Sequence, residues 1–582
     1  MVKKIKKWFL SHIHAFDIKT FGVSFLIAFS VYFFYPISTF MLRGQSDEVP
    51  MNADSVITNS LVIPILFSLF TAFFVAGFWS FLIKKDRNQT VLTVLLTTFL
   101  LVRFEERFSA MLPVLRAFTP LPEQVYSVYS GLLLIIFFVV SYYAAKLLCK
   151  LINKSKTISD GFTTIVVVMS VFLLLTTLIP FGKYVYVTRQ QLSYKPAQLE
   201  TAGLTTDEGT PNIYYIVLDR HTNNTVLKDD FNYDSSDFLN NLRGKGFSIN
   251  ENAYANYPYT ALSIASTMKT GYLTDLGTAF GDSQYQNMSP LFTTIQSSPT
   301  VQALKNIGYR YQLIGNWFGT SDRSALADEV YFNGSNLTVN GNRKYLGLYD
   351  SRFIENSYAY EFLKDAGVYS NASETEQDQY QIATLKQLAL SNQPNAGTFT
   401  FAHILVPHNP FVFNADGSLA TYDSGENNIG KSIKQKYLDQ VKYIDSEVKG
   451  ITDTIIAKDP QAVIVLQSDE GIYPYAILQD EPYQGDVTRS SPNMNEWSDR
   501  YLQAKFGILA AYRLPGVSDE QIANYANSVN IFKLILNEYF NAKIEYDPVC
   551  HIGLSNRSKY YSFTDLTTRL EPNADDTACA TK

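Results

Sequence analysis

The sequence has only three cysteines, no basic patch, no internal repeat and no low-complexity tract. A net charge of −6 that is spread along the chain argues against nucleic acid as a partner. No small-residue cleavage pattern follows the first long apolar run, at 21–42, and further apolar runs come after it. We therefore expect this run to be a permanent membrane anchor and not a cleaved signal peptide.

Apolar runs dominate the chain up to about residue 187. Crossing a bilayer takes about 20 apolar residues. A candidate at 91–112 is weaker, because its apolar run is short and ends at Arg103. The four runs that are long enough lie at 21–42, 61–83, 126–148 and 162–187.

Charge decides whether 91–112 also crosses. Lysines precede the first run, and basic residues follow the runs that end at 83 and 148. Basic loops stay in the cytoplasm, and all three do so only if 91–112 crosses as well. The sequence thus predicts a multi-pass protein of the cell membrane with a cytoplasmic N-terminus. It has five spans within 1–187, a linker at 188–210 and an extracytoplasmic domain at 211–582.

The cysteines agree with this topology. Cys149 falls at the cytoplasmic end of a span, where thiols stay reduced. Cys550 and Cys579 fall in the outer domain, and we predict a disulfide between them, although chance proximity in the sequence is the alternative.

Short apolar strands alternate with helical segments from residue 211 onward, which predicts an α/β domain with a mainly parallel central sheet. The expected strands are 213–218, 311–314, 398–405, 463–466 and 506–512. Helical spacing occurs at 238–242, 261–268, 301–307, 382–390, 437–456 and 531–540.

Three of these strands run into side chains that bind metals or phosphate. They lead to Asp219, to His408 and to the adjacent pair Asp469 and Glu470. Ligand sites of open α/β sheets lie just outside the carboxyl ends of the strands. The alternative is that acidic residues simply open surface loops, but three such endings together favour one site.

Thr260 follows a rigid Asn-Tyr-Pro-Tyr approach and stands where helical periodicity begins. Threonine often caps helices, which is the structural alternative. A hydroxyl at a helix N-terminus also sees the positive end of the helix dipole, which favours an alkoxide and an incoming phosphate. Together with the carboxylates, this position favours a nucleophile. Of the histidines, His408 ends a strand in a Pro-bounded turn, and His403 lies within that strand.

Several motifs in this order resemble the alkaline phosphatase/sulfatase superfamily. The chain is more similar to the membrane-anchored branch that includes lipoteichoic acid synthases and phosphoethanolamine transferases. The resemblance covers most of 212–541. Its motifs are Tyr-Ile-Val-Leu-Asp219-Arg-His, Asn256-Tyr-Pro-Tyr-Thr260-Ala-Leu-Ser, Gly308-Tyr-Arg, His403-x-x-x-Pro-His408-x-Pro-Phe and Gln467-Ser-Asp469-Glu470-Gly.

The resemblance implies a metal site and a covalent mechanism. In the family, a threonine takes a phospho-group from a lipid headgroup, and an acceptor hydroxyl then removes it. Carried over by position, the metal ligands are Asp219, Thr260, Asp469 and Glu470, with Thr260 as the nucleophile. The substrate-binding residues implied are His403, His408, Trp317 and Arg323.

The chain departs from the family pattern at three points. Glu470 stands where many members have histidine, and an oxygen-rich site favours Mn²⁺ or Mg²⁺ over Zn²⁺. Ile314 stands where lipoteichoic acid synthases have histidine, which argues against assigning their exact substrate to this chain. Neither Cys-x-Pro-x-Arg nor its serine form surrounds Thr260, which disfavours sulfate-ester hydrolysis.

Three functions remain open. The leading hypothesis is transfer of a phospho-alcohol group, such as glycerol phosphate, from a membrane phospholipid to an envelope glycan or glycolipid. The second is hydrolysis through the same phospho-threonine, by a phosphodiesterase or phosphatase. The third is an inactive domain that scaffolds an envelope assembly or binds glycans, for which Glu470 is the main support.

Overall fold

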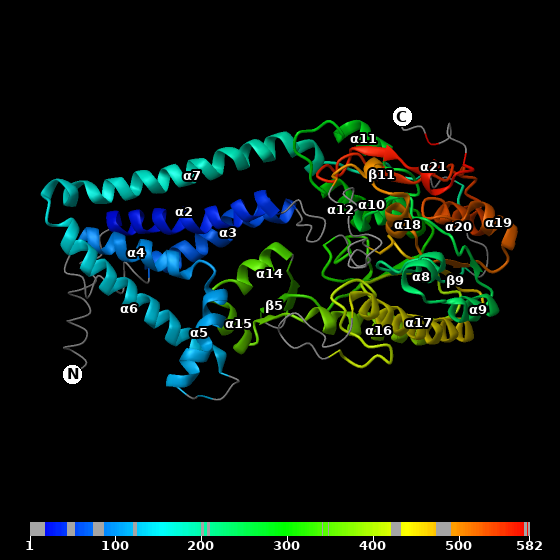
Figure 1. Cartoon of the computed structure of the whole chain (residues 1–582), viewed down its shortest axis with the longest axis horizontal. Helices are drawn as coiled ribbons and strands as arrows, with labels where there is room; N and C mark the ends of the chain where they lie inside the picture. Colours follow the sequence, from blue (N-terminus) through cyan, green and yellow to red (C-terminus); the bar gives the residue numbers. More distant parts are fainter. Residues whose placement is uncertain are drawn as a thin grey trace. The chain divides into compact units, whose positions relative to one another are not determined.

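The computed structural model describes residues 18–579 except 44–52, 74–85, 120, 122–124, 200–202, 206–209, 320, 340–341, 347, 421–431, 473–490 and 575–578. The chain folds into two compact units (Figure 1). The first comprises Met1–Arg189 and Ser335–Asn371, and the second comprises Gln190–Gly334 and Ala372–Lys582.

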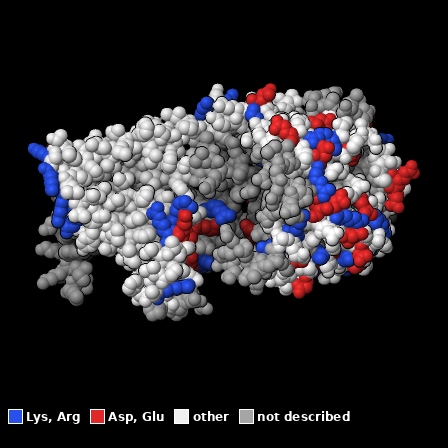
Figure 2. All heavy atoms as spheres, viewed as in Figure 1, with Lys and Arg blue, Asp and Glu red and all other residues white. Residues whose placement is uncertain are grey.

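The first unit contains long apolar helices. Two of its described helices, α6 (Tyr126–Ile152) and α7 (Lys156–Leu192), are long and apolar enough to cross a membrane. Many of their large apolar side chains are exposed, and Figure 2 shows few charged side chains over them. The other helices of this region are α2 (Ile18–Arg43), α3 (Ala53–Ala72), α4 (Arg87–Leu101) and α5 (Phe104–Phe118).

These helices match the expected spans unequally. Helix α2 contains 21–42, whereas the second half of 61–83 lies outside the described residues. The expected span 91–112 is two helices, because the chain leaves α4 at Val102 and Arg103 adopts a left-handed φ of 55°. Two acidic residues then open α5, where they favour a helix start.

The segment Ser335–Asn371 belongs to the first unit, although we expected 211–582 to form one domain. The ring of Phe67 lies 5.0 Å from Phe353 and 5.1 Å from Tyr358. Aromatic packing therefore joins this insertion to the helices of its unit. The insertion contains β5 (Asn336–Val339), β6 (Asn342–Tyr345), α14 (Leu348–Glu355), α15 (Tyr360–Asp365) and β7 (Tyr369–Ser370).

The second unit is built on a seven-stranded sheet of order β2-β10-β9-β1-β8-β3-β4. Strands β9, β1, β8, β3 and β4 are parallel, and β10 runs antiparallel to both of its neighbours. The strands are β1 (Ile213–Leu218), β2 (Ser248–Ile249), β3 (Arg310–Ile314), β4 (Glu329–Tyr331), β8 (Thr398–Ile404), β9 (Val463–Gln467) and β10 (Ala510–Arg513).

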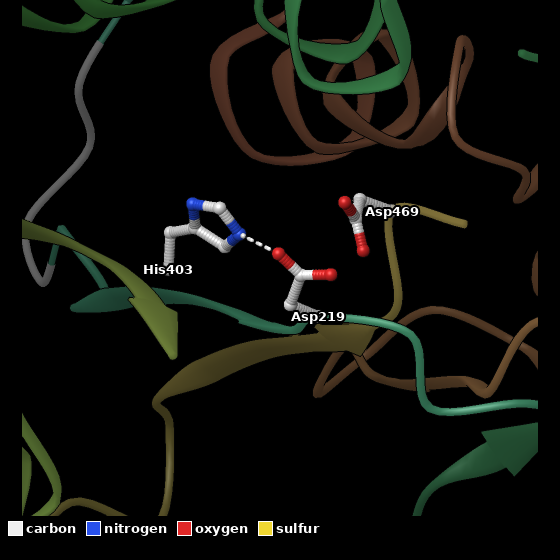
Figure 3. Close-up of side chains that lie close together, drawn as sticks. All are labelled: Asp219, His403 and Asp469. Atoms are coloured by element: carbon white, nitrogen blue, oxygen red, sulfur yellow. Dashed lines mark hydrogen bonds and ion pairs between the residues drawn. The ribbon is translucent and has the colours of Figure 1, made fainter. Parts of the chain in front are cut away.

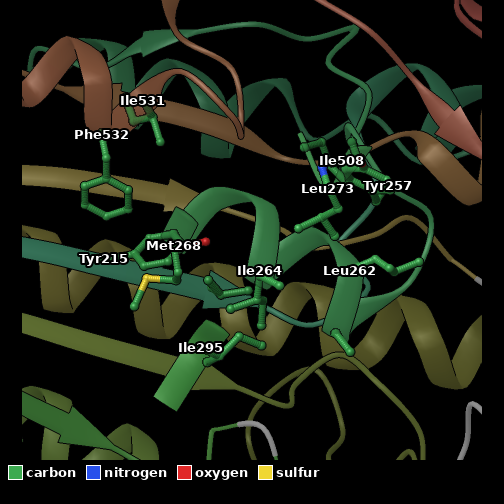
Figure 4. Packing of buried hydrophobic residues seen from close by; sticks show 14 of the residues in the cluster. Tyr215, Tyr257, Leu262, Ile264, Met268, Leu273, Ile295, Ile508, Ile531 and Phe532 are labelled. Atoms are coloured by element: carbon green, nitrogen blue, oxygen red, sulfur yellow. Dashed lines mark hydrogen bonds between the residues drawn. The ribbon is translucent and has the colours of Figure 1, made fainter. Parts of the chain in front are cut away.

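Helices cover both faces of this sheet. Because side chains alternate along a strand, Tyr215 and its alternate neighbours in β1 pack on one face, whereas Tyr214, Ile216 and Leu218 pack on the other. Figure 4 shows Ile264 and Met268 of α10 beside Tyr215 in the first of these cores. Helices α10 (Thr260–Lys269), α12 (Ser289–Gln296), α13 (Pro299–Asn306), α18 (Asp499–Phe506), α19 (Asp519–Tyr525) and α20 (Ile531–Phe540) contribute to this core.

The opposite face is covered by α9 (Ser236–Gly244), α16 (Glu374–Ser391) and α17 (Ile433–Lys458). This arrangement confirms the α/β domain with a mainly parallel sheet. The remaining elements of the unit are α8 (Asn224–Phe231), α11 (Thr274–Phe280), the 3₁₀ helix η6 (Met494–Glu496), β11 (Ile552–Leu554), β12 (Phe563–Asp565) and α21 (Thr567–Leu570).

Candidate metal centre

The carboxyl ends of three neighbouring strands meet at one edge of the sheet. Asp219 directly follows β1, Asp469 follows the end of β9, and His403 lies near the end of β8. Because β1 pairs with both β8 and β9, these three side chains converge (Figure 3). Their ligand atoms lie within 4.8 Å of one another, and all three residues are buried.

The acid pair fits a divalent cation. Asp219 Oδ1 and Asp469 Oδ2 are both buried and have no hydrogen-bond partner among the described residues. Leaving buried carboxylate oxygens unpaired is costly, and a bound cation removes that cost. Asp219 and Asp469 are therefore the residues that would hold a metal, as the family resemblance implies.

The two carboxyl groups titrate in opposite directions. Burial raises the pKa of Asp469 well above its usual range, and the charges of Asp219 and Glu470 add to this effect. Burial alone would also raise the pKa of Asp219, but His408, His403 and Arg220 together lower it to about 2. Of the two carboxyl groups, Asp469 therefore holds a proton more readily than Asp219.

His403 is held in one tautomer. The side-chain oxygen of Asn316 accepts from Phe318 N (2.8 Å) and faces Ser321 Oγ (3.0 Å), which fixes the amide orientation. Asn316 Nδ2 then donates to His403 Nδ1 (3.1 Å), so the hydrogen of the ring is on Nε2. His403 Nε2 consequently donates to Asp219 Oδ2 (3.2 Å), and the ring orients this acid in the metal-free site.

Thr260 is the first residue of α10, and Tyr259 occupies the N-cap position. The Thr260 hydroxyl lowers the pKa of the neighbouring Asp469 carboxyl, against the larger effect of burial, and the residue is 9% exposed. A capping role does not account for this side chain, because its hydroxyl faces the acid pair. The position of Thr260 suits a nucleophile beside a metal.

Glu470 lies outside the three-residue cluster. Its carboxylate accepts from Arg220 Nε (2.8 Å) and pairs with Lys505 Nζ (2.6 Å). Burial lowers the pKa of Lys505, and the charge of Glu470 opposes this effect. Coordination of a metal by Glu470 therefore remains a prediction.

The expected substrate-binding residues differ in their surroundings. Burial lowers the pKa of His408 to about 4, and Arg220 acts in the same direction. The His408 ring is thus neutral at neutral pH, with Nδ1 donating to the carbonyl of Asn409. Trp317 stacks edge-on against Phe318 at 6.2 Å, and Phe318 in turn contacts the His403 ring. Arg323 is exposed and pairs with Asp322 at 3.4 Å.

Cys550 and Cys579 form a disulfide with an S–S distance of 2.00 Å. Four site residues were absent from the sequence-based set: Arg220, Asn316, Ser321 and Lys505. Arg220 follows Asp219 directly, so its place in the motif was a signal. Lys505 lies on α18, a helix with no recognisable motif, and no local pattern marks it.

Residues 211–535 match the family model described as Sulfatase. A search of curated proteins finds no match. Among solved structures, the periplasmic domain of EptC from Escherichia coli in complex with Zn is similar at 12% identity and a TM-score of 0.39. The alignment covers 64% of this chain and 96% of that one.

The integral membrane lipooligosaccharide phosphoethanolamine transferase A (EptA) from Neisseria meningitidis is similar at 13% identity and a TM-score of 0.35, covering 93% and 94% of the two chains. The family model matches more than half of this sequence, and its match begins just before β1 and extends into α20. The chain belongs to the sulfatase family.

Proposed function

We propose that this protein transfers a phospho-alcohol group, such as glycerol phosphate, from a membrane phospholipid to an envelope glycan or glycolipid. Five spans would anchor the chain in the cell membrane with its N-terminus in the cytoplasm and the family domain outside. The observation that carries the proposal is the Thr260 hydroxyl at the start of α10, which neighbours Asp469 of a buried acid pair and lowers the pKa of that carboxyl.

The metal in this proposal is divalent and is held by Asp219 and Asp469 beside Thr260. A ring nitrogen that carries a hydrogen does not bind a metal, so His403 Nε2 is not a ligand. The metal ligands are then oxygen atoms, which favours Mn²⁺ or Mg²⁺ over Zn²⁺. When bound, such an ion neutralises charge on the phosphoryl oxygens and lowers the pKa of a neighbouring hydroxyl.

The chain supplies the nucleophile and a proton acceptor. Thr260 Oγ1 forms a bond to phosphorus, and the bond between phosphorus and the lipid oxygen breaks. The hydroxyl proton passes to the Asp469 carboxylate and from there to the departing lipid alcohol. In the second step, an acceptor hydroxyl attacks the phospho-threonine, and Thr260 regains its proton. His403 keeps Asp219 oriented throughout.

Mass spectrometry of the intact protein after incubation with Mn²⁺ and mixed phospholipids tests this proposal. The wild type is expected to gain the mass of one phospho-alcohol group on Thr260, and that mass names the headgroup. Thr260→Ala is expected to gain nothing and to lose turnover by roughly 10⁴-fold or more. Thr260→Ser, which keeps a hydroxyl, is the matched control and should still be labelled.

Full turnover by Thr260→Ala would overturn the covalent mechanism. Release of free headgroup without any acceptor would replace transfer by hydrolysis of the same intermediate. Sulfate-ester hydrolysis is disfavoured, because neither Cys-x-Pro-x-Arg nor its serine form surrounds Thr260.

A further inference from the structure

The strand end that carries Asp469 also carries a second buried charge cluster. Glu470 lies between Arg220 Nε at 2.8 Å and Lys505 Nζ at 2.6 Å. The side chains of Lys505 and Glu470 are 0% and 1% exposed. Burying a lysine without a counter-ion is strongly unfavourable, so this lysine depends on the carboxylate beside it.

We propose that Glu470 is a positioning residue that holds Arg220 and Lys505 as a phosphate-binding cation pair, and that it is not a ligand of the divalent ion. The inference rests on the proposed function, because the anion to be bound is the phospho-group carried by Thr260. Each oxygen of Glu470 already pairs with a cation, Oε1 with Arg220 and Oε2 with Lys505. Coordination of a metal by Glu470 would weaken these two ion pairs.

The two cations border the nucleophile and the acid pair. Lys505 Nζ lies 4.8 Å from the ring centre of Tyr259, the residue directly before Thr260. The backbone N–H of Arg220 donates to Asp469 Oδ1 at 3.3 Å. Both cations therefore neighbour residues that adjoin Thr260, and their charges would favour a phosphoryl group on its hydroxyl.

The backbone holds this arrangement at two points. A Cβ on Gly471 would lie 2.2 Å from the carbonyl oxygen of Ala504, so only glycine allows the chain after Glu470 to approach α18 this closely. Gly471 N donates to the carbonyl of Lys505 at 2.8 Å, which ties the two halves of the ion pair together. Arg220 adopts a left-handed φ of 62°, an uncommon conformation that is often associated with functional sites.

The charge balance agrees with this role. The site has one net negative charge when all five groups are ionised, because three carboxylates face two cations. The carboxylates are Asp219, Asp469 and Glu470, and the cations are Arg220 and Lys505. A divalent ion turns this excess into a single positive charge. A phosphodiester monoanion then neutralises the site, whereas without the two cations the loaded site would repel it.

The test uses the full chain in detergent. Its Mg²⁺ content is measured, and inorganic phosphate is titrated into the loaded protein by calorimetry. Lys505→Met is expected to keep the metal and to bind phosphate roughly tenfold more weakly, because a charge-assisted contact is lost. Glu470→Gln is expected to keep the metal as well and to weaken phosphate binding to a similar extent, because both cations lose their anchor.

Glu470→Gln removes the carboxylate that Arg220 and Lys505 share, so the double variant Glu470→Gln/Lys505→Met serves as its control. It removes one charge of each sign and is expected to melt at a higher temperature than Glu470→Gln and to retain the metal. Loss of the metal from the double variant, or unchanged phosphate affinity in Lys505→Met, overturns the proposal. Failure of the proposed function is seen separately, as a Thr260 that gains no mass while phosphate affinity still depends on Lys505.

Discussion

The candidate site has an acidic half, Asp219 and Asp469, and a cationic half, Arg220 and Lys505 with Glu470 between them. Apart from the partly exposed Arg220, these residues are buried, but the charges of the two halves are satisfied differently. Among the described residues, one oxygen on each carboxylate of the acidic half has neither a hydrogen bond nor an ion pair, whereas both cations of the other half lie within 2.8 Å of Glu470, Arg220 in a hydrogen bond and Lys505 in an ion pair. Buried oxygens without a partner indicate where a ligand binds, whereas oxygens that already have a partner need no ligand.

Two residues adjacent in the sequence, Asp469 and Glu470, belong to different halves of the site. Asp469 and Glu470 are adjacent carboxylates, yet Asp469 faces Thr260 and Asp219 while Glu470 faces α18. Both residues lie in the bend that follows β9, where the chain turns at Gly471 toward α18, so neighbouring side chains meet different surroundings. The short segment Asp469–Glu470 thus contributes one residue to the proposed metal site and the next residue to the cation pair.

Removing the charge of the acidic half should have the largest effect. Asp469→Asn keeps the shape of the side chain but removes a charged oxygen ligand, and metal affinity is expected to fall more than about a hundredfold. Turnover should be lost with it. Metal content after dialysis measures the effect, and Lys505→Met, which changes the cationic half, is the comparison that should retain its metal. Wild-type metal content in Asp469→Asn would contradict the division of the site.

The acidic half should also respond to pH. Its metal must displace the proton that the raised pKa of Asp469 keeps on the carboxyl. Below that pKa, apparent metal affinity should therefore fall about tenfold for each unit by which the pH is lowered, with about one proton released per metal bound. Calorimetry in buffers of different ionisation enthalpy counts this proton. No buffer dependence would show that Asp469 is already ionised without metal.

A smaller effect is expected from the residues behind His403. Asn316→Leu combined with Ser321→Ala removes the amide at 3.1 Å and the hydroxyl at 2.9 Å from His403 Nδ1 and frees the ring to change tautomer, so turnover should fall about tenfold. Nitrogen chemical shifts of His403 report the tautomer, with a protonated Nε2 expected in the wild type. Ser321→Ala should change the shifts less, because Asn316 remains. An unprotonated Nε2 in the metal-free wild type would contradict the assignment.

Much of the fold was predictable from hydrophobic patterning. Strand 213–218 and helix 531–540 have the predicted bounds, because their apolar residues are continuous or strongly periodic. Helix α16 begins at Glu374, well before the predicted 382, because its first two turns are polar and start from a capping box at Ser373. The predicted strand 506–512 is shorter, since Phe506 ends α18 and β10 begins at Ala510.

The sequence alone determined the α/β class, the apolar helices, and the strand ends that bring Asp219 and Asp469 together. These features depend on local periodicity and on the rule that parallel strands end at a common edge. The partners of Glu470 and His403 were decided only by tertiary structure. Lys505 reaches Glu470 from a separate helix, and Asn316 reaches His403 from a neighbouring strand end. Contacts between distant segments depend on packing, which no local pattern encodes.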